Sequence, residues 1–141
     1  MRALMMASIA LTVVAGPLLG QAEALTEAGE VARDAWYRQA TEVMMEPAIN
    51  GIRVQLPGAD PSGALSRAQG AALLAEYLSG AEEVETTVRA ARVVAADRGY
   101  VELRRRYRVA GTKEIRTETV LLGYREETDR WVLVELRITR N

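Results

Sequence analysis

The side chains most able to do chemistry in this sequence are carboxylates, arginines and tyrosines. The 141 residues contain no cysteine and no histidine. Without these two residue types the chain can form neither a Cys–His nor a Ser–His nucleophile pair, and it cannot build the usual zinc site of nitrogen and sulfur ligands. We therefore expect no metal and no cofactor, and any ligand must be held by charge, hydrogen bonds and apolar surface.

One charged pair is placed by the strand pattern on an otherwise apolar face. A tight turn after Val109 pairs that residue with Glu114 across a hairpin, and so sets Arg105 opposite Glu118. Burying two charges costs several kcal/mol per ion unless they are paired and hydrogen-bonded. The apolar residues expected to share this face are Val101, Leu103, Tyr107, Val109, Val120, Leu122, Tyr124, Val132, Val134, Leu136 and Ile138.

Two interpretations of this pair remain open. It is either a structural ion pair near the end or edge of the sheet, or the polar base of a ligand pocket. In the second case Trp36 or Tyr37 reaches it from the first helix, although aromatic residues at helical spacing are also typical of a core. The candidate ligand-binding residues are Trp36, Tyr37, Arg105, Tyr107 and Glu118.

The opposite face of the same sheet is rich in arginine. Arg104, Arg106 and Arg108 alternate with core residues on one strand, and Arg137 lies on another, so all four are expected to point outward. We expect no carboxylate directly opposite Arg104 or Arg106. The face is either ordinary solvated surface or a docking surface for an acidic protein, and it is also a candidate homodimer surface. We expect no nucleic-acid partner, because the net charge is −1 and no aromatic residue expected to be exposed is interleaved with these arginines.

The first residues have the features of an export signal. Arg2 precedes the uncharged apolar run Ala3–Leu19, and a small-x-small cleavage site follows at Ala22–Ala24. The run is short for a membrane span, which needs roughly 20 apolar residues. We predict that residues 1–24 are a cleaved signal peptide and that residues 25–141 form one exported domain, periplasmic or extracellular, with no stable membrane insertion after cleavage.

Two helices and a short strand are predicted in the first half of the mature chain. Leu25–Glu46 has apolar residues at helical spacing and is followed by a proline. Ser66 and Gln69 form a capping box for a second helix that runs to about Leu78. Between the helices, alternating apolar residues predict a strand over residues 52–56.

Four strands follow, separated by short turns. They are Val84–Ala96, Tyr100–Ala110, Glu114–Arg125 and Arg130–Arg140. Helices and strands that segregate along the chain favour an α+β fold. We predict a curved antiparallel sheet, made of a four-strand meander plus one short strand, with two helices packed on its concave face.

The register of the first meander strand is ambiguous. A three-residue turn at 97–99 would turn Ala91 and Val93 inward. Hydropathy instead favours Val84, Val88, Ala90 and Val94 inward, with Arg89 outward. We adopt the second register, because a slip of one residue exchanges the two faces of a strand.

This order of elements resembles the nuclear-transport-factor-2-like (cystatin-like) superfamily. It is closest to a family of exported bacterial domains of unknown function, in which the pattern Y-S-K-x-Q-A-x-x-x-L-x-x-F-F precedes a strand meander. The matching stretches are residues 65–78 (LSRAQGAALLAEYL), 119–124 (TVLLGY) and 131–138 (WVLVELRI). Leu65 replaces the aromatic residue usual at that position. The resemblance covers most of residues 28–138 and speaks for the fold.

The resemblance implies two classes of function. One is a non-catalytic binding or protein-interaction module with an unknown small molecule or acidic protein as its partner. The other is a small cofactor-free lyase or isomerase, since some enzymes of this fold use a carboxylate base in the hollow of the cone. The residues available for that chemistry are Asp34, Tyr37, Glu118 and Tyr124, and they form no motif. The first class is the one we expect.

The signal-peptide assignment predicts a mature chain that begins at Leu25. N-terminal sequencing of the periplasmic fraction, after expression in a Gram-negative host, should read Leu-Thr-Glu. Recovery of a membrane-bound product that retains Met1 would instead identify the segment as an uncleaved anchor.

Overall fold

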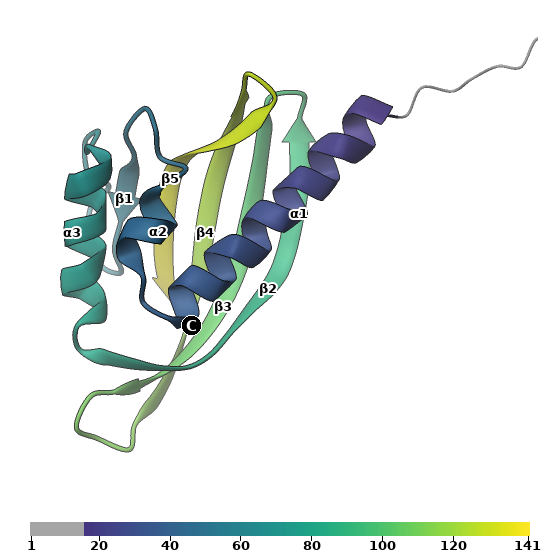
Figure 1. Ribbon diagram of the computed structural model, residues 1–141. Helices are drawn as coiled ribbons and strands as arrows, with labels where there is room; N and C mark the ends of the chain where they lie inside the picture. The colour runs from purple at the N-terminus through teal and green to yellow at the C-terminus, as the bar shows by residue number, and fades with distance from the viewer. Residues whose placement is uncertain (1–15) are drawn as a thin grey trace, which may run out of the picture.

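The computed structural model describes residues 16–141. Its helices lie on one face of a curved, unclosed five-stranded sheet (Figure 1). In chain order the elements are α1 (Gly16–Tyr37), α2 (Thr41–Met45), β1 (Arg53–Gln55), α3 (Arg67–Leu78), β2 (Ala81–Ala95), β3 (Arg98–Val109), β4 (Ile115–Glu127) and β5 (Arg130–Arg140). This arrangement confirms the predicted α+β fold.

The sheet is mixed rather than wholly antiparallel. Its strand order is β1-β5-β4-β3-β2, and the last four strands form the predicted antiparallel meander. β1 pairs with β5 in parallel, with Val54 opposite Leu136. Because α3, β2, β3 and β4 lie between β1 and β5 in the chain, β1 pairs with the free edge of a strand that is distant in sequence. The side chains of Ile52 and Val54 are 2% exposed and belong to the core, as predicted.

The predicted helix Leu25–Glu46 is in fact two helices. α1 ends at Tyr37, and the short α2 starts at Thr41. Between them Gln39 adopts a left-handed conformation with φ of 53°, which no helix can continue. Its side-chain amide donates hydrogen bonds to the carbonyls of Leu78 and Ala81, at 3.5 and 2.9 Å. These tertiary contacts hold the break, and they join it to the end of α3 and the start of β2.

The capping box at the start of α3 is present as predicted. Ser66 accepts a hydrogen bond from the backbone of Gln69, and the Gln69 side chain accepts one from the backbone of Ser66. Ala71, Leu74 and Leu78 face the core, as expected. The other two residues of the predicted stripe, Ala68 and Ala75, are exposed.

The register of β3 against β4 is the predicted one. Val109 donates its backbone N–H to the carbonyl of Glu114, and Arg105 lies directly opposite Glu118. The inward residues of β3, from Val101 to Tyr107, are buried. The same is true of the inward residues of β4 from Glu118 to Tyr124.

The register chosen for β2 is wrong over much of its length. Three irregularities interrupt its pairing with β3, between Glu83 and Glu85, Val88 and Ala90, and Val93 and Ala95. Each adds a residue to β2, so the inward face changes parity along the strand. The inward residues therefore include Val88, as predicted, but also Glu83, Thr86, Ala91 and Val93. Val84 and Val94, predicted inward, are 36% and 60% exposed, and Arg89 is exposed as predicted.

A bulge in β5 changes which of its residues face the core, so the predicted inward set is right for only part of the strand. Gly123 pairs with Glu135 and Tyr124 pairs with Leu133, so Val134 is the extra residue. Leu136 and Ile138 face the core as predicted, but beyond the bulge Trp131 and Leu133 take the inward positions. Val134, which was expected inward, is the half-buried bulge residue. Val132 is fully buried but does not belong to the main core cluster.

Leu25, in the middle of α1, packs against the end of the sheet where β3 begins. Leu25 is fully buried beside Gly99. A Cβ atom on residue 99 would lie only 2.7 Å from Cδ2 of Leu25. Glycine at position 99 thus allows helix and sheet to approach closely. The predicted cleavage point after Ala24 falls within α1, and the rest of the predicted signal, residues 1–15, lies outside the described residues. Over the described range no helix has the length and hydropathy of a membrane span.

Candidate functional site

A buried arginine and two buried carboxylates form the charged centre of the domain. Arg105 on β3 is 1% exposed, and its Nη1 atom donates a hydrogen bond of 3.1 Å to Oε1 of Glu118 on β4. Its Nη2 atom forms an ion pair with Glu83 on β2, whose side chain is 2% exposed. From the surface, Arg140 Nε approaches Oε2 of Glu118 at 3.8 Å. The predicted pair is therefore real, with a second glutamate beside it.

Aromatic rings surround the guanidinium of Arg105. Its central carbon lies 4.1 Å from the ring centre of Tyr107 and 5.6 Å from that of Trp36, distances at which cation–π attraction operates. Tyr77, on α3, donates its hydroxyl to Glu118. Thr86, which faces Arg105 from β2, donates a 3.5 Å hydrogen bond to Glu83. We call these eight residues the Arg105 cluster: Trp36, Tyr77, Glu83, Thr86, Arg105, Tyr107, Glu118 and Arg140.

Burial controls the electrostatics of this cluster. Desolvation raises the pKa of Glu83 above its ordinary value, and the nearby Arg105 opposes that rise without cancelling it. Burial, reinforced by the hydrogen bond to Glu118, raises the pKa of Tyr77, so its phenol stays protonated and remains a donor. Four atoms of the cluster are buried without a hydrogen-bond partner among the described residues: the indole nitrogen of Trp36, Nε and Nη2 of Arg105, and Oε1 of Glu83, of which the last two face one another in the ion pair.

The centre of the cluster is closed to solvent, whereas Arg140 lies at the surface. Trp36, Arg105 and Glu118 are each at most 1% exposed. Of the two helix aromatics considered from the sequence, Trp36 reaches Arg105, whereas Tyr37 points away and is 50% exposed. The predicted residues Trp36, Arg105, Tyr107 and Glu118 thus come together. Of these four, only Tyr107 lines a hollow, one of about 510 Å³ at the surface beside Arg140.

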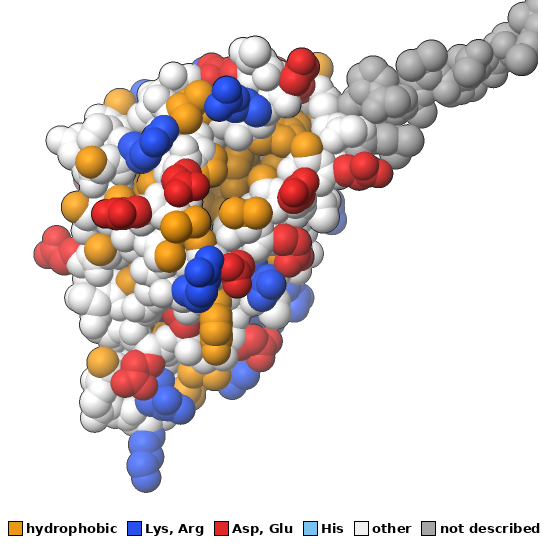
Figure 2. Space-filling model, in the orientation of Figure 1, with side chains coloured by type: hydrophobic (Ala, Val, Ile, Leu, Met, Phe, Trp, Pro, Cys, Tyr) orange, Lys and Arg blue, Asp and Glu red, His pale blue; other side chains and the backbone are white. Residues whose placement is uncertain are grey.

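An open hollow lies elsewhere, between α1 and α2. It has a volume of about 240 Å³ and is lined mostly by apolar side chains. Hydrophobic side chains gather in a depression beside α1 in the space-filling view (Figure 2). The lining residues are Ala24, Glu27, Ala28, Val31, Ala32, Val43, Met44, Pro47, Tyr124 and Trp131. Ala24 is the last residue of the predicted signal peptide, so the other nine would line the hollow in a mature chain that begins at Leu25.

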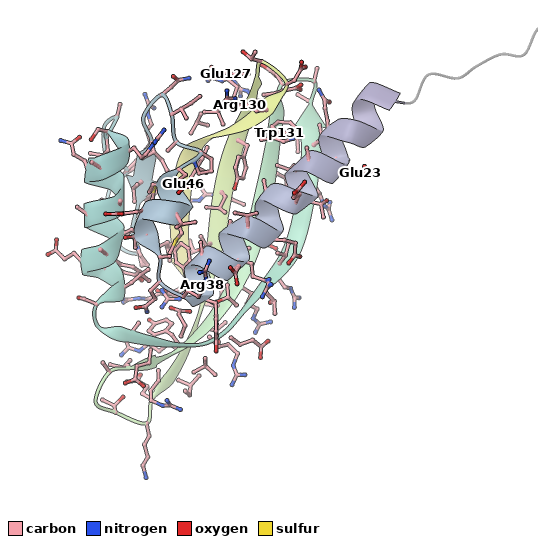
Figure 3. The ribbon with its side chains drawn as sticks, viewed as in Figure 1. Glu23, Arg38, Glu46, Glu127, Arg130 and Trp131 are labelled. Carbon is pink, nitrogen blue, oxygen red and sulfur yellow. The ribbon has the colours of Figure 1, made fainter. Side chains whose placement is uncertain are left out.

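Two aromatic residues of the sheet contribute to this hollow. Trp131, on β5, lies beneath the first half of α1 (Figure 3), and its indole N–H donates a 3.0 Å hydrogen bond to the carbonyl of Gln21. Tyr124, on β4, is 3% exposed, and burial raises the pKa of its phenol. The hollow therefore presents a mainly apolar surface, with a neutral tyrosine inside it and the exposed carboxylate of Glu27 at its side.

The residues considered for acid–base chemistry do not assemble. Asp34 is exposed and forms an ion pair with Arg38, and Tyr37 is exposed. Glu118 is held inside the Arg105 cluster. Only Tyr124 lines the apolar hollow, where Glu27 is the one lining carboxylate among the described residues. Nor does the described part of the chain contain a group of three or more carboxylates placed to hold a metal ion.

The arginine face is more nearly neutral than expected. Arg106 lies directly opposite Glu85 and approaches it at 3.7 Å, and Arg108 approaches Glu82 at 3.4 Å. The expectation that no carboxylate stands opposite Arg106 is therefore wrong, because the β2 bulges bring Glu85 to that position. Arg104 lies between threonines on both neighbouring strands, as expected. Arg137 points to the same outer face and is exposed.

Sequence reasoning missed several members of both sites. Glu83 and Thr86 enter the cluster only because bulges change the parity of β2. Tyr77 follows the buried Leu74 by three residues, a helical spacing that could have placed it facing the sheet. Trp131 faces inward because of the bulge at Val134, for which the sequence carries no clear signal beyond the neighbouring strand's Gly123.

Comparison with known proteins gives structural likeness without sequence likeness. No protein-family model and no curated protein matches the chain. A ketosteroid isomerase-like protein from Erwinia carotovora atroseptica aligns with a TM-score of 0.70 at 10% identity, over 85% of this chain and 95% of that one. A DUF4783 family protein from Bacteroides uniformis aligns with a TM-score of 0.64 at 12% identity, over 79% and 95%.

A third solved structure has the same arrangement of elements. It is a domain of unknown function with a cystatin-like fold from Nostoc punctiforme, with a TM-score of 0.66 and 19% identity over 84% of this chain and 76% of that one. At such identities the likeness establishes the fold alone. The chain has the nuclear-transport-factor-2-like, cystatin-like α+β fold that its sequence resembles.

Proposed function

We propose that this protein is an exported, non-catalytic module that binds a small, mainly apolar molecule in the hollow between α1 and α2. The observation that carries the proposal is the hollow itself, with its apolar lining and one buried tyrosine. Apolar concavities with few polar groups are the usual form of small-ligand sites. The neutral phenol of Tyr124 suits a ligand that carries a hydroxyl or carbonyl group.

The Arg105 cluster supports this proposal by taking a structural role. Arg105, Glu83 and Glu118 are paired with one another and buried, so these three charges are not offered to a ligand. Its members come from α1, α3, β2, β3, β4 and β5. A cluster of this kind anchors the helices on the sheet and leaves the apolar hollow at the other end of α1 to receive the ligand.

The alternative, a lyase or isomerase, needs a carboxylate base beside the substrate. Arg105 forms ion pairs with the two buried glutamates, Glu83 and Glu118, so neither is free to act as that base. The exposed Glu27 lies on α1 at the side of the hollow. The binding function therefore fits the arrangement better than the catalytic one.

Filling the hollow should abolish ligand binding while the fold is retained. The neutral fluorophore N-phenyl-1-naphthylamine should bind saturably to the wild type. Ala28→Leu, which extends a side chain into the hollow, should weaken that binding by at least about tenfold, since a few buried methyl groups displace the ligand. Ala72→Leu is the control, because Ala72 is exposed on α3 and does not line this hollow. Equal binding by both variants would place the fluorophore elsewhere and reject the proposal.

The hydroxyl of Tyr124 should select ligands that can hydrogen-bond. Tyr124→Phe keeps the ring and removes one hydroxyl, so we expect 2-naphthol to lose about 1 kcal/mol of binding free energy and naphthalene to lose almost none. Calorimetric titration of both ligands against wild type and variant measures the difference. An equal change for the two ligands would contradict a hydrogen bond to the phenol.

Removing Arg105 should destabilise the protein more than removing the whole charged group. Arg105→Met leaves two buried carboxylates without their cation, at a cost of about 3–5 kcal/mol in unfolding free energy. Adding Glu118→Leu should recover part of the loss, and adding Glu83→Leu as well should recover most of it. Urea denaturation of the three variants checks this order. Equal midpoints for the single and triple variants would mean that the carboxylates are not stranded by the loss of Arg105.

The raised pKa of Glu83 predicts an unusual pH dependence. Between the usual glutamate pKa of about 4.3 and the raised folded value, the native state binds more protons than the unfolded state. The contribution of Glu83 to stability is therefore full below that usual value and is lost as pH rises through the folded pKa. Relative to Glu83→Gln, the wild type should gain stability as pH falls from 7 toward 4.5. Glu82→Gln, at an exposed neighbour, should show no such trend.

A further inference from the structure

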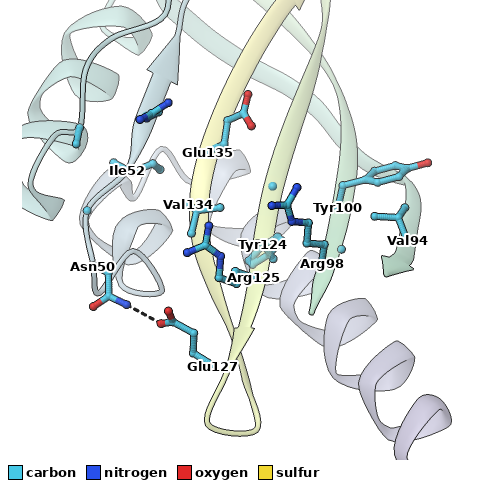
Figure 4. A pocket seen from close by; sticks show the side chains of 15 residues that line it. Asn50, Ile52, Val94, Arg98, Tyr100, Tyr124, Arg125, Glu127, Val134 and Glu135 are labelled. Carbon is cyan, nitrogen blue, oxygen red and sulfur yellow. Dashed lines mark hydrogen bonds between the residues drawn. The ribbon is translucent and has the colours of Figure 1, made fainter. Parts of the chain in front are cut away.

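A second hollow lies on the outer face of the sheet, on the side opposite the helices. It has a volume of about 520 Å³ and is bounded by β1, the start of β3, the end of β4 and the start of β5. Figure 4 shows Arg98, Arg125, Val134 and Glu135 on this face, with the helices behind the sheet. Of its lining residues, only Tyr124 also lines the apolar hollow on the other side of the sheet.

Two backbone features create the outer hollow. Gly123 stands in the middle of β4 between Tyr100 and Glu135, and it leaves the space of a side chain empty at the centre of the sheet. A Cβ there would come within 3.3 Å of the Cβ of Glu135. Beside it, the β5 bulge turns Val134 outward to form part of the floor. Glycine within a strand often marks such a close approach by another group.

The walls of the hollow carry arginines that the fold does not use. Arg98 and Arg125 are direct cross-strand neighbours, and Arg53 lies on the β1 side. None of the three forms an ion pair with a described residue. Like charges directly opposite one another destabilise a sheet unless something anionic is present. This contrasts with Arg106 and Arg108, which have glutamate partners on β2.

The remaining lining residues define what else an anion would meet. Glu127 is occupied by a 2.6 Å hydrogen bond from Asn50, and Glu135 adds a second negative charge at the β5 side. Tyr100, half-buried, and the exposed Val94 lie beside Arg98 and supply apolar surface (Figure 4). The arrangement suits a flat ligand with one carboxylate, because two guanidinium forks can share a carboxylate while the ring next to them takes the flat part.

We propose that this outer hollow is a second binding site, which takes a small aromatic carboxylate between Arg98 and Arg125 with its ring against Tyr100 and Val94. The site lies on the opposite face of the sheet from the apolar hollow between α1 and α2, and the two have only Tyr124 in common. Its affinity falls with salt, since its charges are exposed to solvent.

Calorimetric titration with benzoate tests the proposal. Arg98→Gln and Arg125→Gln should each weaken benzoate binding by about tenfold, the loss typical of a charge-assisted pair. Glu135→Gln should strengthen it, because a negative charge leaves the wall. The matched control is Arg104→Gln, because Arg104 is on the same outer face, forms no ion pair with residues 16–141 and does not line the hollow. Unchanged melting temperatures show that each variant is folded.

Further titrations separate this site from the alternatives. Acetate should bind more weakly than benzoate if Tyr100 and Val94 contact the ring, and Ala28→Leu should leave benzoate binding unchanged. If Arg104→Gln lost as much benzoate affinity as Arg98→Gln, the effect would reflect only the net charge of the protein, and the proposal would be overturned. A loss in Ala28→Leu would move benzoate to the apolar hollow and overturn it equally. The absence of saturable benzoate binding to the wild type would also overturn it.

Discussion

The position of the buried Arg105 between two carboxylates is the constraint on which this fold depends. A guanidinium with almost no exposure must find its counter-charges inside the protein, and here Glu83 and Glu118 reach it from the two neighbouring strands. Trp36 from α1 and Tyr77 from α3 complete its surroundings. Both long helices are therefore tied to the same point of the sheet, and the registers of β2, β3 and β4 must agree there.

The parts of this centre that depend on local chemistry could be predicted from the sequence. The tight turn after Val109 sets the β3–β4 register, and with it the contact between Arg105 and Glu118, because a short hairpin leaves little freedom in pairing. The capping box of Ser66 and Gln69 likewise marks the start of α3 correctly. In both cases residues close in the chain determine the outcome.

The parts that depend on tertiary packing could not be predicted. Gln39 is neither glycine nor proline, and its left-handed conformation is held by carbonyls about 40 residues away. The bulges of β2 are decided by which side chains must face Arg105, and they bring in Glu83 and Thr86 where hydropathy pointed to Val84. The β5 bulge has the same effect, since it places Trp131 and Leu133 instead of Val132 and Val134 in the core cluster and turns the half-buried Val134 to the outer face.

The irregular pairing of β2 also bears on how this protein behaves in crowded solution. β2 is 15 residues long and lies at an edge of the sheet, where an unpaired row of backbone donors and acceptors can template the addition of another chain. Three bulges break that row into short pieces and twist them out of line. A domain without disulfide bonds cannot rely on a covalent link to hold its strands in place. Its longest edge is protected instead by its own irregularity, which makes edge-to-edge aggregation geometrically unfavourable.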